Sequence, residues 1–349
     1  MIQPARLSTL DALRGIAALA VCWFHFTQGN PDFLPDGMLK ASGTYGFLGV
    51  EVFFVISGFI IPYALQRSGY GIADYGRFLL KRIVRLDPPY LVAILVVIAL
   101  GYASAATPGF HGPPFQCSTV QLLLHLGYAN VFFGYPWLNP VFWTLAIELQ
   151  YYLLVGLLYP ILAHRSVVMR ASAFACLAVL AFVITADRFL FHWLFLFMLG
   201  MAAFQLRAGL QRRSQFFLWM MLLGVGAWHA NGSVIAITGI TTAMLLGLYE
   251  ARIGRLLLFF GHISYSLYLV HIPIGVKVIN LSLRFVHTFP GKLGVLIVAW
   301  GTTIATAWLL YRYVERPAQG WSSRISFRKR QSAASGLSVQ AAGPAGPSS

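Results

Sequence analysis

The 349-residue chain is 58% hydrophobic and only 10% charged, with a mean hydropathy of +0.72. Soluble domains contain about 25% charged residues, so this composition excludes an ordinary soluble protein. The net charge of +15 is compatible with nucleic-acid binding. In a membrane protein such a charge more often reflects basic cytoplasmic loops, and we expect no nucleic-acid partner. Three scattered cysteines indicate neither a disulfide framework nor a metal site.

Apolar runs of about 20 residues recur along the chain and predict an all-α, polytopic membrane protein with about ten transmembrane helices. The expected spans are 8–28, 46–65, 88–106, 140–162, 171–186, 189–206, 214–230, 233–249, 256–280 and 292–314. The third span is expected to begin at Asp87-Pro88-Pro89, after a basic loop. Residues 120–133 are too short a segment to span and are expected to lie at an interface or to re-enter the membrane.

The end of the chain and the distribution of its charges set the domain organisation. We expect a membrane domain over residues 1–317 and a disordered cytoplasmic tail over residues 318–349, because the tail is rich in Ser, Ala, Gly and Pro. Asp11 and Arg14 interrupt the first apolar run, so no cleaved signal peptide is expected. With the N-terminus inside, all but five of the 25 Lys and Arg residues fall at cytoplasmic loops or helix ends. This asymmetry predicts that both termini are cytoplasmic.

The first span carries two polar side chains, Arg14 and His25, that are eleven positions apart. At about 1.5 Å and 100° per residue, both lie within about 20° of one helix face and roughly 16 Å apart along the axis. An arginine deep in hydrocarbon is unfavourable, so this face is expected to point into a protein interior or a wet cavity.

The expected orientation places four titratable residues in the outer half of the bundle, namely His25, Glu51, Glu148 and His271. A histidine beside a carboxylate is a common general base, because the acid fixes the tautomer and stabilises the imidazolium that forms. We therefore expect these residues to converge, with a contact between His25 and Glu51 as the most direct geometric test.

Arg82 and Arg85 lie three residues apart at the expected cytoplasmic mouth. Arginines at this spacing can hold phosphates through bidentate, charge-assisted hydrogen bonds, although ordinary positive-inside residues are the alternative. A phosphate-bearing donor could therefore dock from the inside, and a hydroxyl acceptor could approach from outside or from the bilayer. Acyl transfer from a coenzyme A thioester fits this polarity.

Six motifs in order resemble the acyltransferase 3 family of integral membrane O-acyltransferases, over about residues 7–317. They are LDALRGIAALAVCWFH (10–25), GVEVFFVISGFII (49–61), FLLKRIVRLDPPY (78–90), VFWTLAIELQYYL (141–153), GHISYSLYLVH (261–271) and YVERP (313–317). No single motif is decisive, but six in the right order are highly specific. Two positions depart mildly from the family pattern: Glu51 stands where aspartate is frequent, and Thr144 replaces the usual serine.

The resemblance implies an enzyme of the bacterial inner membrane that moves an acyl group, commonly acetyl, from cytoplasmic acyl-CoA to a hydroxyl. The implied acceptor is a sugar of a surface or exported glycan or of a lipid-linked precursor. Acyl-CoA would be a co-substrate, with no resident cofactor and no metal. Beside the bilayer, the donor and the glycan are the implied partners. Some relatives carry an extra extracytoplasmic hydrolase-like domain; none is expected here, so any role for such a domain would have to be in trans.

Nine residues make up the expected site; the resemblance implies the first two groups below, and the third contains further residues of the quoted motifs. The catalytic group is expected to be His25, Glu51 and Glu148; the donor-binding group Arg14, Arg82 and Arg85; and the site-lining group Trp143, Tyr265 and His271. We expect direct transfer, in which the histidine deprotonates the acceptor hydroxyl with help from one of the two acids. A route through an acyl-histidine is the rival mechanism.

Two other functions are compatible with the same residues. Ten spans with buried charge would also suit a transporter or flippase of a glycan precursor or small solute, although no inverted repeat is apparent. A non-catalytic membrane scaffold would have little use for His25 and two buried acids. Individual residues also have structural alternatives. Glu148 could be a clamp between helices, Trp143 an interface anchor, and Glu315 an ion-pair partner of Arg316.

Overall fold

The computed structural model describes residues 8–107, 115–250 and 253–327, and these residues form helices and loops without a strand. The principal helices are α1 (Ser8–Gln28), α3 (Gly49–Arg67), α4 (Tyr75–Ala105), α6 (Trp143–Leu162), α7 (Val167–Val183), α8 (Leu190–Arg207), α9 (Arg213–Asn231), α10 (Ser233–Leu248), α11 (Arg255–Val270) and α13 (Phe289–Leu310). The shorter helices are α2 (Met38–Ala41), α5 (Thr119–Leu126), α12 (Lys277–Ser282) and α14 (Arg316–Arg324). Two π-helical segments interrupt the pattern, at His271–Val276 and Tyr311–Glu315.

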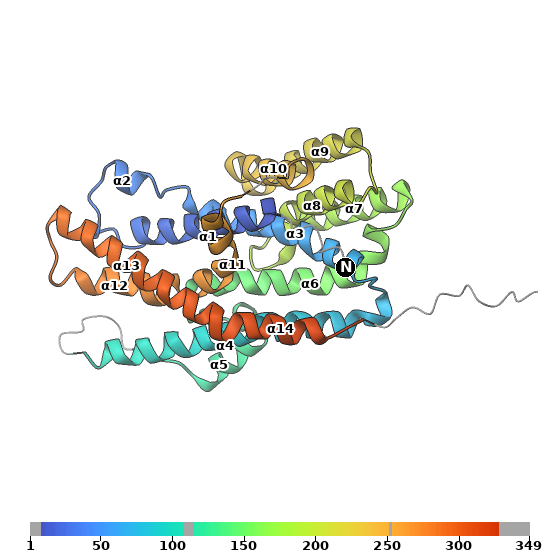
Figure 1. Ribbon diagram of the computed structural model, residues 1–349. Helices are drawn as coiled ribbons and strands as arrows, with labels where there is room; N and C mark the ends of the chain where they lie inside the picture. The colour runs from blue at the N-terminus through green and yellow to red at the C-terminus, as the bar shows by residue number, and fades with distance from the viewer. Residues whose placement is uncertain (1–7, 108–114, 251–252, 328–349) are drawn as a thin grey trace, which may run out of the picture.

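The prediction of an all-α, polytopic membrane protein is confirmed. In the described part of the chain, seven helical segments are long and apolar enough to cross a membrane, and α7 and α10 are shorter apolar helices. All ten expected spans coincide with helices: nine with the helices just described, and the span 214–230 with α9. Residues 184–189 between α7 and α8 are not helical, so the expected hairpin at Asp187-Arg188 separates two helices. Figure 1 shows α9 and α10 along one long edge and α4, α5 and α14 along the opposite edge.

Helix α4 begins earlier than expected. It starts at Tyr75 rather than at Asp87, so the basic residues that were assigned to a loop lie on the first turns of the helix. The two prolines, Pro88 and Pro89, lie inside the helix. Proline removes one backbone hydrogen bond, but membrane helices tolerate it where neighbouring groups satisfy the freed carbonyls. The sequence rule that a proline pair opens a helix was therefore wrong here.

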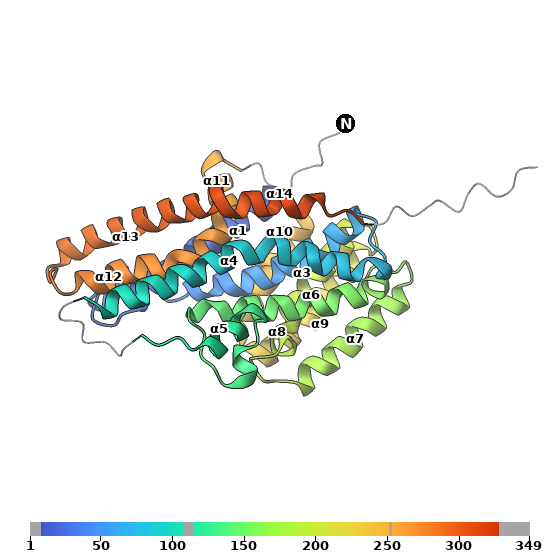
Figure 2. The ribbon, with the colours of Figure 1, turned by 90° about the horizontal axis from the view of Figure 1, so that it is seen from below.

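The predicted start of the disordered tail at residue 318 was also wrong. Helix α14 continues to Arg324, and it packs on α4, because the Ser322 hydroxyl donates to the Lys81 carbonyl oxygen at 2.8 Å. Lys81 Nζ in turn donates to the carbonyl of Ile325 at 3.2 Å. Ala318 is fully buried in this contact. Residues 328–349 lie outside the described part of the chain. Figure 2 shows α14 lying along α4.

Helices α1 and α11 pack in close contact through glycines. A Cβ atom on Gly15 would lie 2.9 Å from the backbone nitrogen of Gly261, and one on Gly261 would lie 2.3 Å from the carbonyl oxygen of Asp11. Small residues allow such backbone approach between membrane helices. Further along the same pair of segments, a Cβ on Gly275 would lie 2.2 Å from the ring of Phe26. The glycines therefore fix how α1 lies against the segment 255–276.

Candidate active site

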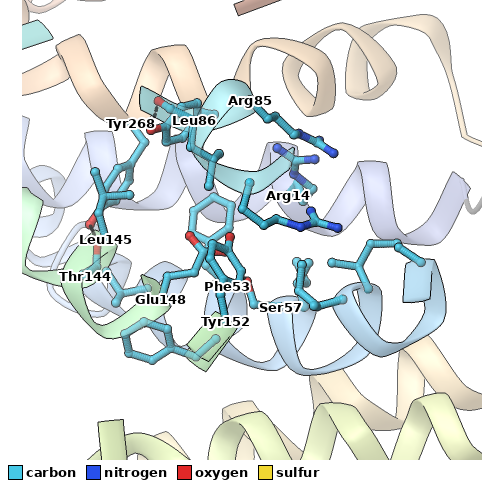
Figure 3. A pocket seen from close by; sticks show the side chains of 18 of the residues that line it. Arg14, Phe53, Ser57, Arg85, Leu86, Thr144, Leu145, Glu148, Tyr152 and Tyr268 are labelled. Carbon is cyan, nitrogen blue, oxygen red and sulfur yellow. Dashed lines mark hydrogen bonds between the residues drawn. The ribbon is translucent and has the colours of Figure 1, made fainter. Parts of the chain in front are cut away.

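A cavity of about 240 Å³ lies between α1, α3, α4, α6, α11 and the π segment Tyr311–Glu315. Its polar lining consists of Arg14, Ser57, Arg82, Arg85, Thr144, Glu148, Tyr152, Tyr265, Tyr268 and Glu315. Figure 3 shows Arg14 and Arg85 at one end, Thr144 and Tyr268 at the other, and Glu148 and Ser57 between them. We call the first the arginine end. The cavity thus contains five of the nine residues that the sequence assigned to the site.

The arginine end is formed by Arg14 from α1 and by Arg82 and Arg85 from α4. Arg82 is only 9% exposed, and its guanidinium lies over the rings of Phe78, at 5.4 Å, and Tyr152, at 5.8 Å. Among the residues that the structure describes, the buried Arg82 Nε atom has no hydrogen-bond partner. The positive charges of Arg82 and Arg14 lie close enough to Arg85 to repel its charge. Three like charges and an unused donor make this end suited to an anion.

Glu315 is the acid of the arginine end, and the sequence did not place it there. It is 2% exposed, and its Oε2 accepts from the Ser266 hydroxyl at 2.6 Å and from the Ser266 backbone N–H at 3.3 Å. Its charge acts on Arg14 and Arg85. The ion pair expected with Arg316 is absent from the described residues, and Arg316 is exposed. The π segment turns Glu315 inward, which helical periodicity does not predict.

Glu148 stands in the middle of the cavity. Its Oε1 accepts a hydrogen bond of 2.7 Å from the hydroxyl of Ser57 on α3, so it links α6 to α3 while it faces the cavity. Glu148 therefore links two helices, as the clamp alternative predicts, and also lines the cavity, as expected of a site residue. Ser57 was not singled out from the sequence, although it lies within the second-span motif.

Tyr268 and Thr144 close the end of the cavity that lies away from the arginines. The two hydroxyl oxygens are 2.8 Å apart, and each hydroxyl also lies within hydrogen-bond distance of the Val141 carbonyl. The ring of Tyr268 lies 5.9 Å from that of Phe53, which also lines the cavity. The Tyr268 ring also lies 5.7 Å from that of His271. We call Tyr268 and Phe53 the septum, because both line the cavity and Tyr268 also contacts His271, which lies outside it.

His25 and His271 form a pair behind this septum. The Nε2 atom of His271 lies 3.2 Å from Nδ1 of His25, and His25 Nδ1 also lies 3.0 Å from the carbonyl oxygen of Val21. His271 is fully buried and His25 is half-buried. Arg14 and His25 share a helix face, as expected, but only Arg14 lines the cavity.

The predicted contact between His25 and Glu51 was wrong. Within the described chain, His25 has no hydrogen bond or ion pair with Glu51 or Glu148, and His271 occupies the position expected for an acid. The close packing of α1 on the 255–276 segment explains this, because it places His271 directly against His25. Glu51 is 4% exposed, its Oε2 has no hydrogen-bond partner, and its charge acts on Tyr268.

The two remaining site-lining candidates lie in different places. Tyr265 lines the cavity, and its hydroxyl donates to the carbonyl oxygen of Leu86 at 3.0 Å. Trp143 does not line it; its ring lies 5.3 Å from that of Trp193 and 6.1 Å from that of Phe54. Among the described residues, no group of three or more His, Cys, Asp or Glu side chains could hold a metal ion.

The chain is similar to known proteins over most of its length. A family model of the acyltransferase domain matches residues 7–312. The chain is 28% identical to "Putative membrane-bound transacylase BcsY" of Komagataeibacter xylinus, over 93% of this chain and 86% of that protein. It is 29% identical to the O-acetyltransferase OatA of Staphylococcus aureus, over 47% of this chain and only 26% of OatA. No solved structure gives a significant match.

Proposed function

This chain belongs to the acyltransferase 3 family and is a membrane O-acyltransferase, and we propose that its donor is acyl-CoA and its acceptor a sugar hydroxyl. Acetyl is the proposed acyl group, as the name of OatA suggests for that relative. The proposed acceptor belongs to a surface or exported glycan or to a lipid-linked precursor. The names of these relatives specify no sugar, and the acceptor is proposed from the family resemblance.

One observation carries the proposal for the donor: three arginines from two helices meet at one end of an otherwise largely apolar cavity. The phosphates of coenzyme A are anions that guanidinium groups bind through charge-assisted hydrogen bonds. The unpaired Nε of Arg82 is a buried donor that such a ligand would satisfy. We propose that the phosphates lie at the arginine end and that the thioester points towards Tyr268.

The proposed reaction is a direct transfer. His25 takes the proton of the acceptor hydroxyl on Nε2, and the oxygen attacks the thioester carbonyl. The new C–O ester bond forms, the C–S bond breaks, and the proton passes from His25 to the departing thiolate. His25 and His271 do not line the cavity, so on this path the septum of Tyr268 and Phe53 would shift before the thioester reaches the base. Glu148 would line the path of the acyl group.

We further propose an orientation in the inner membrane of a bacterium. The arginine end would face the cytoplasm, where acyl-CoA is made, and both termini would lie on that side. The distribution of Lys and Arg supports this orientation. The histidine pair would then lie towards the outer leaflet, where an exported acceptor arrives.

The test is thiol release from acetyl-CoA by the purified protein in lipid nanodiscs, with a glycan extract as acceptor. Replacing Arg85 with Gln removes one to two charged hydrogen bonds, so the KM for the donor should rise about 10- to 100-fold. Arg77→Gln is the matched control, because Arg77 lies on the same helix but is exposed and pairs with Asp74 at 3.7 Å. An unchanged donor KM in Arg85→Gln, with the fold intact, would remove this end from the donor site. Solute flux in vesicles without any thiol release would instead favour the transporter.

A further inference from the structure

The contact between His25 and His271 bears on which ring nitrogen of His25 acts as the base. We propose that His271 is a positioning residue, which accepts a hydrogen bond from Nδ1 of His25 and so leaves Nε2 of His25 as the basic nitrogen. The proposal rests on the proposed function for the identity of the base. It adds a role for a residue outside the cavity, and it replaces the carboxylate that the sequence suggested as the partner.

The hydrogen-bond partners assign the protons of the pair. His271 Nδ1 lies 2.7 Å from the carbonyl oxygen of Tyr268, which can only accept, so Nδ1 of His271 must carry a proton. A neutral imidazole then has an acceptor at Nε2, which lies 3.2 Å from His25 Nδ1. The Val21 carbonyl, 3.0 Å from His25 Nδ1, is a second acceptor for the same proton, which the two partners share. Both partners of His25 therefore demand the same tautomer, with the lone pair on Nε2.

The neutral form of His271 follows from its surroundings. Its side chain is fully buried, and its ring nitrogens face the backbone carbonyls of Tyr268 and Leu267 and the ring of His25. Its protonation would place a second charge directly against His25 in a site without a bridging acid. When His25 takes a proton on Nε2, its Nδ1–H still donates to the same acceptor. His271 can thus hold the ring of His25 in both protonation states of the reaction.

The backbone around His271 is built to fix its position. Pro273 has no N–H, so in a regular helix the carbonyl of Leu269 would lose its partner; the Nδ2 atom of Asn139 donates to that carbonyl at 3.1 Å instead. The π segment begins at His271, and π segments are frequent at functional sites. Gly275 lets the segment press against Phe26 of α1, one residue beyond His25. The two imidazole rings are therefore held with centroids 5.0 Å apart.

Activity measurements on three variants test the role. His271→Leu removes the acceptor, so kcat should fall about 100-fold, at the low end of the usual contribution of a general base, while the donor KM stays within about twofold. His271→Gln offers a carbonyl oxygen near the position of Nε2 and should recover most of kcat. The control is Thr303→Val, because Thr303 is equally buried beside the same π segment and its hydroxyl has no hydrogen-bond partner among the described residues. Equal losses in the Leu and Gln variants would overturn the proposal.

A double variant separates positioning from packing. If His271 acts only through His25, adding His271→Leu to His25→Ala should lower the residual activity less than twofold. A full further loss would mean that His271 acts in its own right. Nitrogen NMR of ¹⁵N-histidine protein, assigned against His25→Ala, reads the tautomer in the unaltered enzyme. A proton on Nε2 of neutral His25 would refute the role of His271 even if the protein is active in the acyltransferase assay. Failure of that assay alone would contradict only the proposed function.

Discussion

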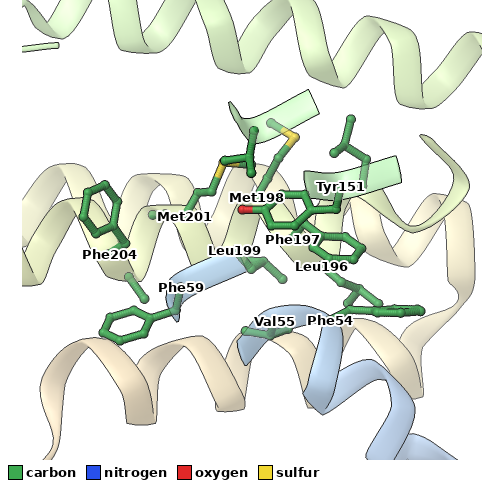
Figure 4. Packing of buried hydrophobic residues seen from close by; sticks show 14 of the residues in the cluster. Phe54, Val55, Phe59, Tyr151, Leu196, Phe197, Met198, Leu199, Met201 and Phe204 are labelled. Atoms are coloured by element: carbon green, nitrogen blue, oxygen red, sulfur yellow. The ribbon is translucent and has the colours of Figure 1, made fainter. Parts of the chain in front are cut away.

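The α3–α8 interface and the region around the cavity bury their surfaces in different ways. Gly58 and Gly200 face each other between α3 and α8, where a Cβ on either would lie 2.1 Å from a carbonyl oxygen of the opposite helix. The side chains around this contact, such as Phe59, Phe197 and Leu199, form a large apolar cluster (Figure 4). Backbone approach and dispersion contacts hold this interface together.

The cavity region depends instead on pairs of polar groups from different helices. Ser57 holds Glu148, and Ser266 holds Glu315, at 2.7 and 2.6 Å. Polar groups within a membrane are unfavourable unless they are paired, and such groups commonly mark functional sites. Helix α3 belongs to both regions, because one of its faces packs on α8 and the other presents Phe53 and Ser57 to the cavity. The difference predicts that the α3–α8 interface is sensitive to volume, whereas the cavity is sensitive to polarity.

The largest expected effect in the polar region comes from His25→Ala. Removal of the proposed base should lower kcat about 10²- to 10⁴-fold in the thiol-release assay. Because His25 is half-buried at the end of α1, the melting temperature should change little. His287→Ala, in an exposed loop position, is the control. A variant of His25 with full activity would leave the chemistry without a base and would sink the direct mechanism.

Glu315→Gln is expected to act on stability through the arginines. It leaves the charges of Arg14 and Arg85 without their nearby acid, and breaking a buried charge arrangement costs about 3 kcal/mol. The melting temperature of the free protein should therefore fall, and coenzyme A should raise it more in the variant than in the wild type, because an anion restores the balance.

The matched control for that experiment is Glu250→Gln. Glu250 pairs with Arg207 at 3.5 Å, but both side chains are partly exposed, so the loss should stay below about 1 kcal/mol. An equal loss in both variants would show that Glu315 has no special relation to the cavity.

Sequence reasoning located the helices because an apolar run of about 20 residues is a strong signal and any charge within it is conspicuous. That rule selected Arg14 and Glu148, whereas Arg82, Arg85 and Tyr265 came from the family motifs that contain them; all five line the cavity. It could not show which helices touch. His25 and His271 are 246 positions apart, and they meet because glycines bring α1 against the segment 255–276.

The π segments explain most of what periodicity missed. A regular helix turns about 100° per residue, and an inserted π turn rotates every later side chain out of that register. His271 and Glu315 lie within the two π segments, and these are the residues whose partners were assigned wrongly or not at all. The early start of α4 had another cause, because a tolerated proline pair looks the same in sequence as a helix boundary.

Gly58→Ala tests the claim that the α3–α8 interface responds to volume. The added methyl group would meet the backbone of Phe197 rather than a flexible side chain, so the helices must separate. We expect a loss of about 1–3 kcal/mol in stability, measured by thermal unfolding, with an unchanged donor KM. Gly294→Ala on α13 has open space around its Cβ and should lose nothing. If the two variants unfold alike, close backbone packing is not what stabilises this interface.

The smallest expected effect comes from Thr144→Val, which keeps the shape of the side chain and removes one hydroxyl. Tyr268 then loses the 2.8 Å contact but keeps the Val141 carbonyl, so the septum is held less firmly by about 1 kcal/mol. If the septum must move before the thioester reaches His25, kcat should rise up to about fivefold with the donor KM unchanged. Thr144→Ser retains the hydroxyl and should match the wild type. A fall in kcat for Thr144→Val but not for Thr144→Ser would have the opposite meaning. Tyr268 would then act from the position it occupies in this structure, and the acyl group would reach the histidine pair without displacing it.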